Sequence, residues 1–104
     1  VAEGVSDIGG GAFLGCVNLT EVELPASLTH LGRNVFGDAT YKSNVTSVTF
    51  HGDAPLYDAD IGLPGSKCTI HVHQNAMGWG ETWQDCPVKR DLESGKIGLT
   101  DFLK

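Results

Sequence analysis

The chain lacks the excess of positive charge with which proteins bind nucleic acids and anionic membranes. It carries 7 Lys and Arg against 13 Asp and Glu among 104 residues, which gives a formal net charge of −6 at pH 7. Because these partners are bound by clustered Lys and Arg, we expect no nucleic acid partner. No stretch approaches the roughly 20 apolar residues that span a bilayer, so we expect no membrane insertion within this sequence.

Catalytic motifs are missing as well. The sequence contains no nucleophile elbow, no phosphate-binding glycine loop, no zinc-protease motif and no paired-cysteine redox motif. The three glycines at 9–11 match none of these motifs, and the need for a chain reversal explains them. We therefore expect no enzymatic activity, no catalytic residue and no cofactor.

The histidines are too few for a convincing metal site. His71 and His73 lie two apart, so a strand would point both rings to one face, and His51 ends the neighbouring expected strand. Zinc or copper binding is one interpretation of this arrangement. We favour solvent-facing imidazoles and expect no metal, because structural zinc sites usually have four good ligands.

Cysteine is also scarce, and its number is odd. Cys16, Cys68 and Cys86 leave at least one thiol unpaired within a single chain. Cys68 and Cys86 flank a segment that holds both tryptophans. They would form a disulfide only if their Cα atoms came within about 7 Å, and the sequence leaves this question open.

What the chain does have is an internal repeat. Residues 5–13 recur 23 residues later as residues 28–36, and residues 18–24 recur 26 residues later as residues 44–50. The change of offset places a three-residue insertion within residues 38–43. A period in the twenties with apolar residues in register is typical of stacked solenoid turns, because one such unit cannot bury its own hydrophobic face. This pattern predicts one domain with an extended binding surface.

Each repeat predicts one short strand with a buried face. Apolar residues alternate with polar ones in residues 21–24, 47–50 and 69–73, which is the period of a half-buried strand. Residues 5–8 and 28–31 form a second extended piece, followed by glycine at 9 and 32. We expect Phe13 and Phe36 to pack inward from a short helical or 3₁₀ segment and to stack on each other.

The first repeat resembles the BspA-like leucine-rich repeat family. The shared positions run through residues 8–28: Ile8, Gly9, Ala12, Phe13, Cys16, Leu19, Val22, Leu24, Pro25, Ser27 and Leu28. The resemblance covers residues 2–50, although the second turn has Val35 for Ala and Ala39 for Cys. It implies that Cys16 points inward as a small buried hydrophobe. Residues 78–83 resemble a Gly-Trp-Gly-x-Thr-Trp ending that follows such repeats in secreted bacterial proteins.

These observations lead to a fold prediction. We expect an α/β, right-handed leucine-rich-repeat solenoid with short strands and short helical or 3₁₀ turns. It would have about two full repeats (5–27 and 28–53), a degenerate third (54–73) and a tryptophan-bearing cap (74–88). Residues 1–88 would form the repeat domain, and residues 89–104 a linker or C-terminal extension.

The resemblance implies a non-enzymatic interaction module of a bacterial cell-surface or secreted protein. Such modules adhere to host proteins, cells or glycans, so we expect extracellular localisation, with signal and anchor outside this fragment. A structural spacer is one alternative, and a carbohydrate-binding module using Trp79, Trp83 or Tyr57 is another. We also expect weak self-association through the open edge of the first repeat. The predicted ligand face consists of the outward strand residues Glu21, Glu23, Ser47, Thr49, His71 and His73.

Overall fold

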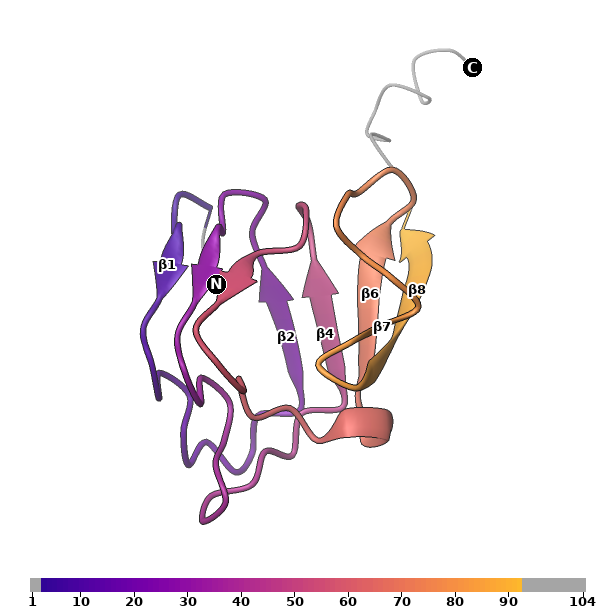
Figure 1. The fold of residues 1–104 in the computed structure, drawn as a ribbon. Helices are drawn as coiled ribbons and strands as arrows, with labels where there is room; N and C mark the ends of the chain where they lie inside the picture. The colour runs from indigo at the N-terminus through magenta and orange to yellow at the C-terminus, as the bar shows by residue number, and fades with distance from the viewer. Residues whose placement is uncertain (1–2, 93–104) are drawn as a thin grey trace.

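The computed structural model describes residues 3–92, which form a β-solenoid of about four turns (Figure 1). The solenoid matches the prediction, but the regular elements of this range are nearly all strands, and η1 is its sole helical element. Residues 93–104, which we expected to form most of a linker or extension, lie outside the described range. The elements are β1 (Asp7–Ile8), β2 (Glu21–Leu24), β3 (His30–Leu31), β4 (Ser47–Phe50), β5 (Leu56–Tyr57), η1 (Gly65–Lys67), β6 (Thr69–His73), β7 (Thr82–Trp83) and β8 (Cys86–Leu92).

Two parallel sheets form the walls of the solenoid. The longer sheet has the order β2-β4-β6-β8, and the shorter has the order β1-β3-β5. Figure 1 shows β2, β4, β6 and β8 side by side, with β1 set apart from them. β7 pairs antiparallel with the start of β8. None of the helices formed by residues 3–92 is long and apolar enough to cross a membrane.

The core lies between the two sheets and follows the predicted alternation. Leu24, Phe50 and Val72 stack in register on β2, β4 and β6, and each is at most 2% exposed. Val22, Val48 and Ile70 form the adjacent buried row. Burial of an apolar side chain of this size contributes roughly 1.5–3 kcal/mol, so the repeated rows stabilise each turn against the next.

The segments around the two repeat phenylalanines are turns, which corrects the helical expectation. The Phe13 N–H donates to the Val35 carbonyl at 2.8 Å, and the Phe36 N–H donates to the Ile61 carbonyl at 2.9 Å. These amides bind the next turn of the solenoid, so they are not available for hydrogen bonds within a helix. The predicted stacking is confirmed, because the rings of Phe13 and Phe36 lie 5.7 Å apart at an interplanar angle of 11°.

The third turn is more regular than predicted. Residues 54–73 were expected to form a degenerate third repeat. Instead, β5 pairs with β3, and the Asn34 N–H donates to the Asp60 carbonyl at 2.8 Å. Ile61 is fully buried and takes the position of Val35, since its carbonyl accepts from the Phe36 amide as the Val35 carbonyl accepts from the Phe13 amide. The turn therefore keeps the solenoid path with fewer apolar residues.

A fourth turn follows, in which β8 extends the longer sheet beside β6. This strand includes residues 89–92, which the sequence placed in the linker. Arg90 holds the preceding loop in place, because its guanidinium donates to the carbonyl oxygens of Gln74, Ala76 and Trp79 at 3.3, 2.8 and 2.9 Å.

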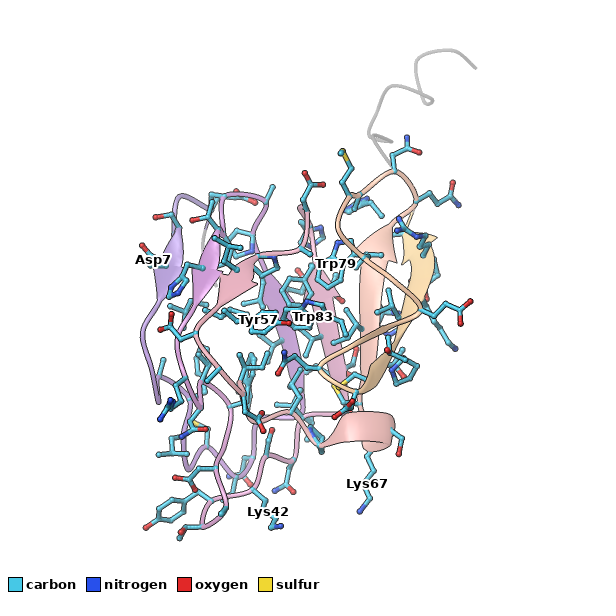
Figure 2. All side chains as sticks on the ribbon, in the orientation of Figure 1. Asp7, Lys42, Tyr57, Lys67, Trp79 and Trp83 are labelled. Carbon is cyan, nitrogen blue, oxygen red and sulfur yellow. The ribbon has the colours of Figure 1, made fainter. Side chains whose placement is uncertain are left out.

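The tryptophans cover the core beyond β5, where the described part of the shorter sheet ends. The rings of Trp79 and Trp83 lie 5.2 Å apart, and each contacts Phe50. Trp83 also meets Tyr57 edge-on at 5.5 Å (Figure 2). Residues 74–83 thus form an aromatic cover over the third turn, and they contain no helix.

Candidate interaction surface

The predicted ligand residues lie together on the outer face of the longer sheet. Strand register places Glu21 beside Ser47 in one row. The next row contains Glu23, Thr49, His71 and Lys89, from β2 to β8. His73 lies one step further along β6, where it contacts His51. We call the outward residues of these three rows the sheet face.

Charge is distributed unevenly across the sheet face. Glu21 and Glu23 are exposed on β2, and the Glu23 side chain is 75% exposed. Ser47 and Thr49 on β4 are half-buried and neutral, and Lys89 is exposed on β8. The face therefore presents two carboxylates on β2, hydroxyl and imidazole groups in the middle, and the Lys89 ammonium together with the Asp91 carboxylate on β8.

Asp91 holds the ring of His71. The His71 Nδ1 atom lies 2.8 Å from the nearer Asp91 carboxylate oxygen, and the His71 side chain is 25% exposed. Because a carboxylate only accepts hydrogen bonds, Nδ1 carries the proton in this contact. The ring orientation is thus fixed by a residue on the neighbouring strand.

A second chain of contacts joins three strands. His51 Nδ1 lies 3.1 Å from His73 Nε2, and His51 Nε2 lies 3.5 Å from the Glu23 carboxylate. One arrangement with neutral rings satisfies both contacts: His51 donates from Nε2 to Glu23 and accepts at Nδ1 from His73 Nε2. No group of three or more His, Cys, Asp or Glu residues within 3–92 is placed to hold a metal ion.

Three contributors to this surface were absent from the predicted set. His51 continues β4 by one residue, and its place beside His73 follows from the same register that aligns Phe50 with Val72. Lys89 and Asp91 belong to β8, which the sequence assigned to a linker from residue 89 onward. The alignment of Ile70 with Val88 places both of them beside the histidines.

The shorter sheet carries a separate polar ladder. His30 on β3 contacts Asp7 on β1 through Nδ1 at 3.3 Å and Asp58 through Nε2 at 2.8 Å. Leu56, aligned with His30, is 74% exposed. This ladder crosslinks three successive turns and lies on a different sheet from the predicted ligand residues.

The tryptophans do not offer a sugar-stacking platform. Trp79 and Trp83 are only 7% and 8% exposed, and their rings are occupied by Phe50 and by each other. Tyr57 is 45% exposed, so of the three aromatic residues proposed for carbohydrate binding it alone presents much surface. Stacking on a sugar requires an accessible ring face, which both indoles lack.

An open hollow lies on the side of the solenoid from which the insertion loop projects. Its volume is ≈ 960 Å³, and its lining consists of residues 34, 37–40, 42–46, 60, 62–64 and 67, which include two lysines. Lys42 and Lys67 lie near each other on this side of the molecule (Figure 2). Asp38 orders the loop by accepting hydrogen bonds from the Thr40 and Tyr41 amides at 2.8 and 2.7 Å. Asp38 and Asp60 offset the two lysine charges.

The three cysteines differ sharply in environment. Cys16 is exposed, which contradicts its expected burial, and Ala39 at the equivalent position of the second repeat is exposed too. This repeat position faces outward because residues 11–18 form an open turn. Cys68 and Cys86 are fully buried.

Comparisons with known proteins identify no relative of this chain. A scan of protein families finds no matching family, and searches of curated proteins and of solved structures find no match.

Proposed function

We propose that this chain is a BspA-like leucine-rich repeat segment of a bacterial cell-surface or secreted protein. Its function would be adhesion, through binding of a protein on host or neighbouring cells, with no catalytic step. The observation that carries the proposal is the sheet face, where polar side chains from four parallel strands stand in register. A glycan is the alternative ligand for the same surface.

The sheet face has properties that favour binding. Its side chains project from a hydrogen-bonded sheet, and Asp91 and Glu23 restrain His71 and His51. Binding to restrained groups loses less conformational entropy than binding to mobile ones. The two glutamates at the β2 edge would favour a ligand that places cationic groups over β2, and this preference would fix its orientation.

A binding screen at physiological salt tests the proposal. The folded chain would be screened against extracellular-matrix proteins and a glycan array. We expect a saturable interaction with a protein that is weakened by Glu21→Lys combined with Thr49→Lys. A separate His71→Ala variant tests whether the imidazole contributes to binding.

Matched substitutions away from the face control for charge. Glu81→Lys combined with Thr40→Lys makes the same charge change at two exposed positions, one before β7 and one in the insertion loop. Binding that survives in this control and fails in the sheet-face variant supports the proposal. A hit that is insensitive to the sheet-face variant contradicts the assigned surface, and no hit with a folded sample favours the structural spacer.

A further inference from the structure

Cys68 and Cys86 are neighbours across two parallel strands. Ile70 on β6 aligns with Val88 on β8. Cys68 directly precedes β6 and Cys86 begins β8, each two residues before this aligned pair, so the register continued by two residues sets them side by side. Adjacent strands lie about 4.8 Å apart, within the separation of Cα atoms that a disulfide spans.

Both side chains point into the core. Cys68, just before β6, continues the inward alternation of Ile70 and Val72, and all three are fully buried. Cys86 is also fully buried at the start of β8. Since both sulfurs lie on the inner side of adjacent strands, a bond between them requires only side-chain rotation.

The two thiols already interact. The neighbouring Cys86 sulfur and burial raise the pKa of the Cys68 thiol. The Cys68 thiol and the Gly65 amide lower the pKa of Cys86. Cys86 is therefore the sulfur that ionises first and attacks an oxidant. The Cys68 thiol also donates to the Thr69 carbonyl at 3.9 Å, and the Cys86 thiol to the Gln84 carbonyl at 3.5 Å.

We propose that Cys68 and Cys86 form a disulfide that locks β8 and the tryptophan cover onto β6. With glutathione disulfide as oxidant, local opening exposes Cys86. Its thiolate then attacks one sulfur of the oxidant and releases a glutathione thiolate. Cys68, after losing its proton, attacks the mixed disulfide at Cys86 and releases the second. The protein loses two electrons and two protons, and one glutathione disulfide becomes two glutathione thiols. Cys16, exposed and far along the chain, is the unpaired cysteine.

The disulfide would close a loop that contains β6, both tryptophans and β7. Closing a loop of this length raises stability chiefly by restricting the unfolded chain, so we expect a thermal midpoint about 10–20 °C higher in the oxidised protein. Because both sulfurs are buried, reductants would reach them only through local opening. We therefore expect slow reduction by glutathione under native conditions.

The test uses the Cys16→Ser variant, which leaves the two buried thiols intact. The reduced protein is incubated with excess glutathione disulfide, denatured and treated with iodoacetamide. We expect no carbamidomethylation and a mass lower than that of the reduced protein by two hydrogen atoms. Trypsin leaves both cysteines in residues 68–89, so a second cleavage after Glu81 separates them. The two halves remain joined only by a disulfide.

The outcomes separate the proposal from its alternatives. Two alkylated cysteines, or a separate glutathione adduct on each, would overturn it. Equal thermal midpoints for the oxidised and reduced forms would refute the lock even if the bond forms. The oxidised and reduced forms have the same sequence, so a difference between their thermal midpoints cannot come from a substitution in the core.

Discussion

Gly62 and Gly32 lie where successive turns of the solenoid come closest, and replacing them with alanine tests this stacking. A Cβ atom on Gly62 would overlap the Gly37 carbonyl oxygen and lie 2.5 Å from the Gly37 nitrogen, and the Gly62 φ is +84°. A Cβ on Gly32 would overlap the Gly10 nitrogen and lie 2.8 Å from its Cα. The Gly32 φ is not in the left-handed region. Gly62→Ala thus combines a backbone overlap with an unfavourable positive φ, whereas Gly32→Ala has the overlap alone.

Two further glycines separate these penalties. Gly15 has a φ of +80° with nothing within 4 Å of its Cβ position, whereas Gly9 has neither a positive φ nor a close neighbour. A non-glycine residue at positive φ costs about 1–2 kcal/mol. Overpacking costs about 1–3 kcal/mol, and backbone neighbours yield less easily than side chains. Alanine also gains about 0.4–1 kcal/mol by restricting the unfolded chain.

The expected order of stability follows from these magnitudes. Gly9→Ala should be neutral or slightly stabilising, and Gly15→Ala should cost about 1 kcal/mol. Gly32→Ala should cost about 2–3 kcal/mol, and Gly62→Ala at least about 3 kcal/mol. Urea unfolding, followed by the fluorescence of Trp79 and Trp83, measures all four. The reasoning is refuted if Gly62→Ala is no less stable than Gly15→Ala, because the turns would then not approach as closely as described.

Three further predictions concern the core, the thiols and the open edge. Phe36→Ala should lower the free energy of unfolding in urea by about 3–5 kcal/mol, and Phe13→Ala by less, because Phe36 is 3% exposed and Phe13 only partly buried. Equal losses would contradict the deeper burial of Phe36. In the reduced Cys16→Ser protein, iodoacetamide should label both buried thiols slowly, through local opening, and Cys86 before Cys68 at neutral pH, because the pKa of Cys86 is lowered and that of Cys68 raised. Peptide mapping at partial labelling would disprove this if Cys68 reacts first. Light scattering at high concentration should detect weak self-association of the parent chain. Glu23→Val should increase it by removing a charge from β2, the edge strand of the described longer sheet. Strictly monomeric samples of both the parent chain and the variant would count against this prediction.

The parts of the fold that the sequence predicted are those where hydrophobic periodicity and structure coincide. Val22 and Leu24 alternate with glutamates, and Val48 and Phe50 repeat the pattern, so β2 and β4 were expected at their observed positions. The stacking of Phe13 on Phe36 followed from their equivalent places in the repeat. All six predicted ligand residues face outward for the same reason.

The elements that were missed are defined by backbone pairing. Leu56 and Tyr57 of β5 are both exposed, so their sequence shows no buried face, and only hydrogen bonds to β3 make them a strand. In β8, exposed residues occur consecutively near its end, which hides the alternation. Because β8 was not expected, the contact between Asp91 and His71 was not either. The resemblance placed Cys16 inward, but the turn that holds it is open.

The most direct test of the proposed function compares two double variants on one ligand. For the first saturable protein hit, dissociation constants would be measured for the parent chain, for Glu21→Lys with Thr49→Lys, and for Glu81→Lys with Thr40→Lys. We predict a loss of about tenfold or more for the sheet-face variant and an unchanged constant for the control. Equal losses in both would show that net charge governs binding. An unchanged sheet-face variant would contradict the assignment of the sheet face as the binding surface.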